Sequence, residues 1–180
     1  MLFETALGVC GIAWGQGALT GVQLPEADAE ATLARMRRRF SGVRDIGPEI
    51  APPTFVARAI EDIVALLRGE PNAPRDLSNI ALDWTGVPPF NRRVLQLART
   101  IAPGQTMTYG EVAAGLGEPG AARAVGQALG HNPFAPVVPC HRVLAAASAS
   151  GGFSASGGVS TKLRMLLIER AAFGAPGLFD

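Results

Sequence analysis

The sequence predicts an α+β protein with a β-containing part over residues 1–84 and a mostly helical part over residues 85–180. Three observations support this fold class. Residues 2–24 show a strand pattern, several later segments carry apolar residues at helical spacing, and Gly86-Val87-Pro88-Pro89 interrupts the chain between the two parts. With 180 residues and 48% hydrophobic residues, the chain can build a core in one domain or two small ones.

The first part is expected to contain a β-hairpin, two helices and a short last strand. Gly15-Gln16-Gly17 supplies the hairpin turn, and the first helix ends on three arginines, which suit the negative end of a helix dipole. The expected hairpin covers residues 6–24, the helices cover 28–40 and 54–68, and the last strand covers 79–83.

The second part is expected to contain four helices, over residues 90–101, 108–116, 121–129 and 162–169. Thr108 and Glu111 have the spacing of a capping box at the start of the second of these. A turn over residues 117–120 joins the second and third helices, which is the pattern of a helix-turn-helix. The third helix is rich in Ala and Gly, with Arg123 its one charged residue, so it can approach either a neighbouring helix or another surface closely.

Charge and cysteine content narrow the class of protein. The net charge is +1, divided into −3 over residues 1–84 and +4 over residues 85–180, which is only weak evidence for a polyanionic partner. Cys10 and Cys140 are too few for a disulfide framework. The first residues lack the basic start of a signal peptide, and no apolar run approaches the ~20 residues that span a bilayer. We therefore expect a cytoplasmic protein with reduced thiols.

Residues 132–143, with the sequence NPFAPVVPCHRV, form the segment that indicates a reactive cysteine. Its three prolines favour a rigid, extended path that ends on Cys140. The adjacent His141 and Arg142 could stabilise a thiolate. Because neighbouring side chains of an extended segment point to opposite faces, we expect no direct hydrogen bond between the Cys140 sulfur and the His141 ring. Proton transfer between them would need a relay through water or a bend at Cys140.

Other chemistries find little support in the sequence. Cys10, His131, Cys140 and His141 are the only Cys and His residues, and they lack the spacing of zinc sites, so no metal is expected. Neither of the glycine-rich nucleotide-binding motifs is present, so no cofactor is indicated.

Four short strings together resemble the O6-alkylguanine-DNA alkyltransferase family, also called methylated-DNA–protein-cysteine methyltransferases. They are TYGEVA at 108–113, ARAVG at 122–126, Asn-Pro at 132–133 and PCHRV at 139–143. The resemblance is strong over residues 86–170 and looser over residues 1–85. It implies a small ribonuclease-H-like N-terminal domain and a helical C-terminal domain with a helix-turn-helix and wing.

The resemblance also implies a function, which is repair of O6-alkylguanine in double-stranded DNA by a monomer that is consumed in one turnover. The second helix of the helix-turn-helix would enter the minor groove, where only small side chains fit. Arg123 would fill the gap that a flipped nucleotide leaves in the base stack. The residues implied in DNA contact are Thr108, Ala122, Arg123 and Gly126.

Within the family's chemistry, Cys140 would accept the alkyl group. His141 would take the thiol proton through a water, and Glu169, seven residues after Lys162, would orient His141. Asn132 would hold the active-site turn through backbone groups. Tyr109 would donate its hydroxyl proton to the departing guanine.

The remaining implied residues line the substrate pocket, and here the sequence departs from the family. The pocket residues are Val143, Phe153, Ser154 and Ser156, and the loop over residues 152–158 is two residues longer than usual, so either serine could contact the base. A second departure is the helix start at residues 90–95, where a Gln and a Trp are more usual. We interpret that difference as a tolerated core variation.

Two other functions compete with repair. The first is a helix-turn-helix sensor in which Cys140 reports alkylation and repair is secondary. The second is a cysteine hydrolase, although no oxyanion-hole motif is evident. The rate and completeness of label transfer from alkylated DNA to Cys140 distinguish repair from the sensor function. Multiple turnover on an ester or peptide would support the hydrolase.

Overall fold

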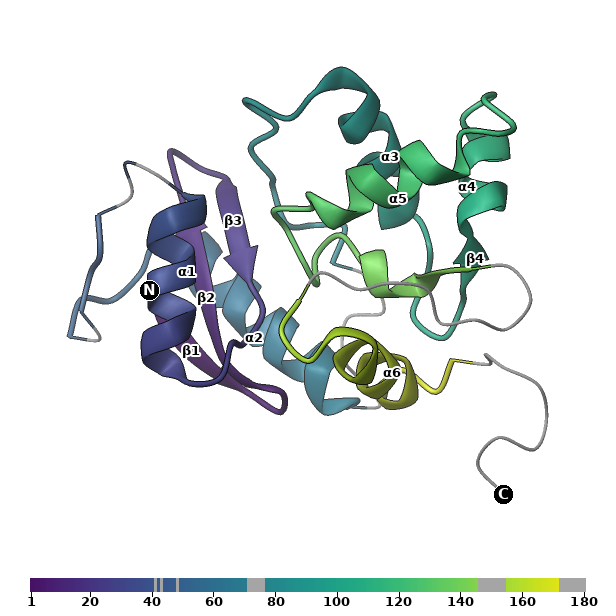
Figure 1. Cartoon of the computed structure of the whole chain (residues 1–180). Helices are drawn as coiled ribbons and strands as arrows, with labels where there is room; N and C mark the ends of the chain where they lie inside the picture. Colours follow the sequence, from purple (N-terminus) through teal and green to yellow (C-terminus); the bar gives the residue numbers. More distant parts are fainter. Residues whose placement is uncertain (41, 43, 48, 71–76, 146–154, 172–180) are drawn as a thin grey trace. The chain divides into compact units, whose positions relative to one another are not determined.

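The computed structural model describes residues 1–180 except 41, 43, 48, 71–76, 146–154 and 172–180. The described residues divide into two compact units (Figure 1). The first unit contains residues 1–86 together with 133–137 and 155–157, and the other described residues form the second unit. That residues 1–84 and 85–180 fold as separate domains stays a prediction.

The first unit is built on a three-stranded antiparallel sheet in the order β1 (Leu2–Thr5), β2 (Gly8–Trp14) and β3 (Leu19–Gln23). The predicted hairpin between β2 and β3 is confirmed. The sequence pattern did not separate β1 from β2, because the turn between them is very short. Gly8 ends that turn with a φ of +125°, a conformation that favours glycine.

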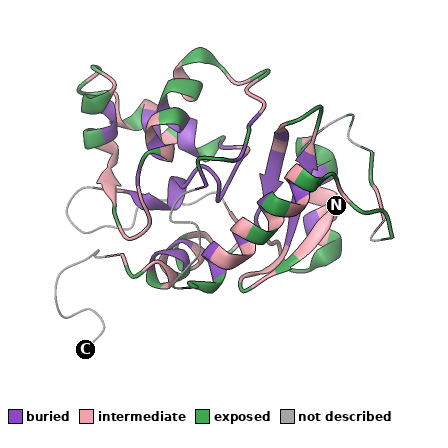
Figure 2. Cartoon of the chain, turned by 180° about the vertical axis from the view of Figure 1, so that it is seen from behind, coloured by how far each residue is buried: buried purple, intermediate pink, exposed green. Residues whose placement is uncertain are grey.

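Helices α1 (Ala29–Arg39) and α2 (Thr54–Arg68) cover opposite faces of this sheet (Figures 1 and 2). The Asp28 side chain caps α1 by accepting a hydrogen bond from the backbone N–H of Ala31 at 2.7 Å. Glycines on β2 and β3 let α1 approach, since a Cβ at Gly11 would collide with Met36. The side of α2 that packs on the sheet is a buried stripe of Val56, Ala59, Ile63, Leu66 and Leu67.

The predicted strand over residues 79–83 is wrong. Leu82 makes only an isolated bridge with Leu19, although Leu19 exchanges backbone hydrogen bonds of 2.9 and 2.8 Å with residues 81 and 83. The pairing ends there because the next part of the same β3 edge bonds another segment, where the Val22 N–H donates to the Pro133 carbonyl at 2.8 Å. The edge is therefore shared by two short segments of the chain.

The second unit is mostly helical, as predicted. Its elements are α3 (Pro89–Arg99), β4 (Met107–Thr108), α4 (Tyr109–Gly115), α5 (Ala122–Gly130), the 3-10 helix η1 (Cys140–Arg142), β5 (Val143–Leu144) and α6 (Gly158–Ile168). Helices α3, α4 and α5 pack on one another around a core of Val94, Leu95, Ala98, Val112, Val125 and Ala128.

The unusual start of α3 is only partly a core variation. Leu95 is 1% exposed and belongs to the core. The side chain of Arg93 is 49% exposed and bonds the surface of the second unit, so the core interpretation is wrong for this residue. Across the described part of the chain, no helix combines the length and the apolar character that a membrane crossing requires.

Candidate active site

Cys140 begins a tight turn. The predicted extended path does not continue through it, because residues 140–142 form the 3-10 helix η1. The Cys140 N–H donates to the Val138 carbonyl, and the Arg142 N–H donates to the Pro139 carbonyl, both at 2.9 Å. Cys140 is 7% exposed. The turn therefore holds the thiol at a fixed place with slight access to solvent.

Asn132 fixes the segment that leads to this turn. Its side-chain nitrogen Nδ2 donates to the Val138 carbonyl at 2.8 Å, and both groups are buried. The bond closes the five residues between them into a loop that begins at the end of α5 and returns to η1. This geometry matches the expectation that Asn132 bonds backbone groups next to Cys140.

His141 and Glu169 form the predicted contact, with Nε2 of His141 lying 2.9 Å from Oε1 of Glu169. Glu169 is the first residue after α6 rather than a residue of the helix. Burial acts to raise the pKa of Glu169, but hydrogen bonds and charges from His141 and Arg142 outweigh it and lower the pKa to about 2. Because the carboxylate is ionised, it can only accept, so Nε2 of His141 carries the hydrogen of this bond.

The other ring nitrogen of His141, Nδ1, is buried and has no hydrogen-bond partner among the described residues. The expectation of no direct bond from the ring to the Cys140 sulfur therefore holds at Nδ1, although its premise of an extended backbone was wrong. Burial lowers the pKa of His141 more strongly than its hydrogen bond to Glu169 raises it. The imidazole is accordingly neutral near pH 7, and the lone pair on Nδ1 is available to accept a proton.

Arg142 completes the cluster, although it was expected from the sequence to supply only a nearby positive charge. Its Nε donates to Oε2 of Glu169 at 2.8 Å, and its Nη2 donates to Oε1 at 2.7 Å. Its Nη1 donates to the Ile101 carbonyl at 2.5 Å, just beyond the end of α3. These contacts could not be predicted from the sequence, because Arg142 lies 27 positions from Glu169 and 41 positions from Ile101.

Lys162 is a second residue of the site whose role was not predicted from the sequence. Its side chain is fully buried, and Nζ donates to the Val143 carbonyl at 2.7 Å. Nζ also lies 5.7 Å from the centre of the Tyr109 ring. Burial lowers the pKa of Lys162 to about 8, and a negative charge on Cys140 acts to raise it.

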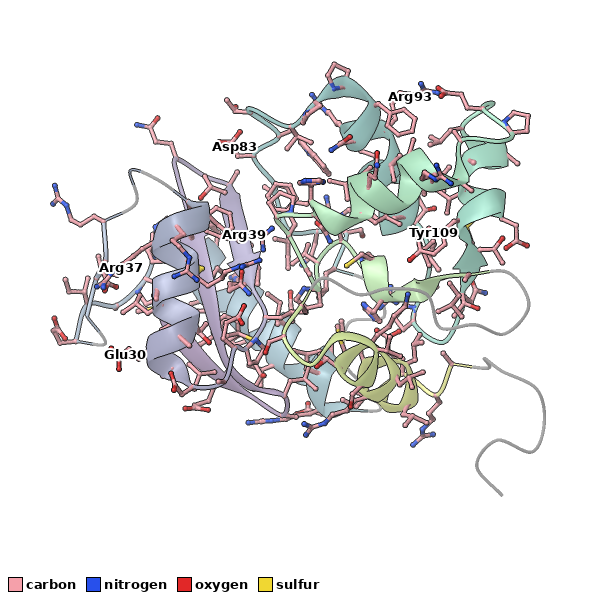
Figure 3. All side chains as sticks on the ribbon, viewed as in Figure 1. Glu30, Arg37, Arg39, Asp83, Arg93 and Tyr109 are labelled. Atoms are coloured by element: carbon pink, nitrogen blue, oxygen red, sulfur yellow. The ribbon has the colours of Figure 1, made fainter. Side chains whose placement is uncertain are left out.

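Tyr109 lies at the start of α4, and Figure 3 shows it beside β4. Burial raises the pKa of its hydroxyl, and a negative charge on Cys140 raises it further. The phenol therefore keeps its proton near neutral pH and can donate it. Parallel pairing of β4 with β5 joins this end of α4 to the chain that leaves η1, with Thr108 opposite Leu144.

The predicted capping box at Thr108 is confirmed. The Thr108 hydroxyl donates to Oε2 of Glu111 at 2.8 Å and accepts from the Glu111 N–H at 3.1 Å. A contact from this hydroxyl to DNA would require it to turn away from Glu111.

Helix α5 carries the other residues expected at DNA. Arg123 is exposed, and Ala122 is half-buried. Gly126 faces Tyr109, since a Cβ there would lie 3.8 Å from a ring carbon of Tyr109. The structure therefore places Gly126 beside a catalytic candidate, and Arg123 on the surface.

The pocket residues are only partly described. Val143 is buried and bonded to Lys162 through its carbonyl. Ser156 is half-buried just before α6, whereas Phe153 and Ser154 lie outside the described residues. Among the described residues, no three His, Cys, Asp or Glu side chains gather as a metal site would need.

Cys10 has a different environment from Cys140. It is fully buried in β2, and its sulfur lies 3.6 Å from the Thr5 hydroxyl. Burial raises the pKa of the Cys10 thiol to about 12. This thiol therefore stays protonated at neutral pH.

Known proteins resemble this chain in sequence and in fold. The family described as 6-O-methylguanine DNA methyltransferase, DNA binding domain, matches residues 89–171. The methylated-DNA–protein-cysteine methyltransferase of Mycolicibacterium paratuberculosis is 45% identical over 118 residues, which are 66% of this chain and 67% of the relative. Its counterpart in Methanothermobacter thermautotrophicus is 33% identical over 159 residues, covering 88% and 78%. The crystal structure of Mycobacterium tuberculosis OGT in complex with DNA is 30% identical, covers 94% of this chain and 91% of that one, and has a TM-score of 0.71.

Proposed function

The chain belongs to the methylated-DNA–protein-cysteine methyltransferase family, and we propose that it takes the alkyl group from O6-alkylguanine in duplex DNA and keeps it on Cys140. The observation that carries this assignment is the arrangement at η1. Cys140 begins a buried turn, and the next side chain, His141, is held by ionised Glu169 through Nε2. The other ring nitrogen of His141, Nδ1, has no hydrogen-bond partner among the described residues.

The reaction begins with ionisation of the thiol. The Cys140 proton passes through a water to Nδ1 of His141, whose ring is oriented by the bond from Nε2 to Glu169. The thiolate is the reactive form of cysteine, so this transfer prepares the nucleophile.

The thiolate sulfur then attacks the sp³ carbon attached to O6. A sulfur–carbon bond forms while the O6–carbon bond breaks, and the electron pair of the broken bond remains on guanine. Tyr109 donates its hydroxyl proton to the guanine as this charge develops, and its raised pKa keeps that proton on the phenol at neutral pH until then. The thioether has no easy route back, so each molecule acts once.

The alkylated base must leave the duplex before this reaction, because O6 lies inside the base stack. Helix α5 presents Ala122 to the minor groove, which admits only small side chains, and Arg123 fills the space of the flipped nucleotide. Gly126, which faces Tyr109, adds no side chain that would hold the helix away from the groove. Thr108, at the start of α4, contacts the DNA when its hydroxyl turns away from Glu111. Val143 is our candidate for the pocket that receives the base, and the pocket roles of Phe153, Ser154 and Ser156 stay predictions from the family resemblance.

The chemistry uses no cofactor, because the acceptor is the protein's own thiol. We assign the protein to the cytoplasm, as a monomer that acts on double-stranded DNA.

Mass spectrometry of the intact protein after mixing with a duplex oligonucleotide containing O6-methylguanine tests this function. We expect one methyl mass per molecule, located on Cys140 by peptide mapping, with no further gain when DNA is in excess. Tight binding to the oligonucleotide with no added mass would indicate the sensor function instead. Catalytic turnover of an ester without a retained group would indicate a hydrolase.

A further inference from the structure

Arg93 connects α3 to the turn between α4 and α5 (Figure 3). Its Nη1 donates to Oε1 of Glu118 at 2.7 Å, and its Nη2 donates to the Leu116 carbonyl, also at 2.7 Å. Leu116 is the C-cap directly after α4, and Glu118 lies two residues later in the turn. One guanidinium group therefore bonds a backbone acceptor and a carboxylate of the same turn, which is a geometry that its planar fork suits.

Two features of this turn leave the start of α5 dependent on backbone groups. Gly117 and Gly120 have φ values of +77° and +102°, so two of its four residues are glycines in conformations that other residues rarely adopt. Helix α5 begins at Ala122 without a side-chain cap, since Ala121 occupies the N-cap position. The start of α5 is therefore fixed mainly by the backbone of the turn.

Glu118 is the residue through which that backbone joins the two helices. Its N–H donates to the Ala113 carbonyl in α4 at 3.0 Å, and its carbonyl accepts from the Ala121 N–H at 3.0 Å. A side chain that restrains Glu118 consequently restrains the first residues of α5. Arg93 is the residue seen to do this.

We propose that Arg93 is a positioning residue, which holds the α4–α5 turn and so pre-organises α5 for DNA. The effect on DNA rests on the proposed function, whereas the restraint on the turn does not. Both Nη groups of Arg93 are already engaged within the protein, so the proposal assigns Arg93 this restraint rather than a direct phosphate contact.

The test compares Arg93→Gln with Arg92→Gln. Both arginines are exposed on α3, and each substitution removes one positive charge, but only the first removes the bonds to Leu116 and Glu118. Amide hydrogen exchange of residues 121–123 is measured without DNA. Transfer rates are measured with a methylated duplex and with free O6-benzylguanine.

We expect Arg93→Gln to speed exchange of these amides and to slow duplex transfer about two- to fivefold, the size typical of an exposed ion pair. Transfer from the free base should be unchanged, and Arg92→Gln should leave exchange unchanged. Glu118→Gln removes a negative charge that would face DNA, yet it should also speed exchange of the same amides.

Unchanged exchange in Arg93→Gln, or equal slowing of the duplex reaction by both arginine variants, would overturn the proposal and leave Arg93 as a surface charge. Equal slowing on the duplex and the free base would also overturn it, because the defect would then lie in the active site. Failure of the wild-type protein to transfer from either substrate would instead refute the proposed function, while the exchange measurement would still test the restraint.

Discussion

Arg142 holds the carboxylate of Glu169 with two hydrogen bonds, from Nε to Oε2 at 2.8 Å and from Nη2 to Oε1 at 2.7 Å. The same Oε1 accepts the hydrogen of His141 Nε2. The side chains of Glu169 and Arg142 are only 3% and 4% exposed, so this ion pair is almost fully removed from water. The residue that follows His141 in the chain thus fixes the carboxylate that orients His141.

Removing one partner of this pair should destabilise the fold more than removing both. Arg142→Met leaves the Glu169 charge buried without its main partner, which costs about 3 kcal/mol or more. The double variant Arg142→Met/Glu169→Gln carries no buried carboxylate and should recover much of that loss. Urea unfolding at pH 7 measures both free energies. A double variant as unstable as the sum of the two single variants would contradict this account.

Glu169→Gln should slow alkyl transfer at neutral pH by about 100-fold, the lower range for loss of general-base assistance. The amide lacks the negative charge that favours a proton on His141, so fewer Cys140 thiols ionise at neutral pH. Raising the pH should recover part of the rate, because hydroxide then removes the thiol proton without His141. The measurement is the rate of transfer from free O6-benzylguanine between pH 6 and 10. A wild-type rate at every pH would show that Glu169 plays no part in the reaction.

Much of this site could be predicted because its determinants are local. Helix periodicity and the capping box at Thr108 depend on residues within one or two turns, and the contact from His141 to Glu169 followed from the family resemblance. The active-site turn held by Asn132 was likewise expected only from the family resemblance, because it depends on a bond across a proline-rich segment. Propensity alone favours extension there.

The roles of two cations were hidden for a related reason. Buried Lys162 and exposed Arg93 look alike in a sequence, and each is defined by an acceptor at least 19 residues away. Such partners become visible only when the helices are packed.

Lys162 should give the protein a specific dependence of stability on pH. Its pKa is lowered from 10.5 to about 8 in the folded state, so the unfolded chain binds more protons between these values. Stability from this group therefore rises as pH increases from about 8 to 10.5. The free energy of unfolding of wild type, relative to Lys162→Met, should increase by roughly 1 to 2 kcal/mol over that interval. A constant difference across the interval would mean that the ammonium group is not hindered by burial.

Arg123→Ala should separate base flipping from chemistry. If Arg123 occupies the space of the flipped base, its loss should slow repair of duplex DNA by at least about tenfold, since extrusion of a base costs a few kcal/mol. Transfer from free O6-benzylguanine needs no extrusion and should be nearly unchanged. Single-turnover rates on the two substrates give the comparison. Similar slowing on both would point to a disturbed α5 instead.

The two cysteines allow the nucleophile to be identified within one molecule. Cys140→Ser should abolish transfer while leaving binding to methylated duplex DNA largely intact, because a serine hydroxyl does not ionise near neutral pH. Cys10→Ser should transfer at the wild-type rate, since burial raises the pKa of the Cys10 thiol to about 12 and keeps it protonated. Peptide mapping by mass spectrometry locates the added methyl group, and repeating the reaction at pH 9 tests the distinction where an exposed thiol would already be ionised. A methyl group on Cys10 with Cys140 unmodified, at either pH, would refute the assignment of Cys140 as the acceptor.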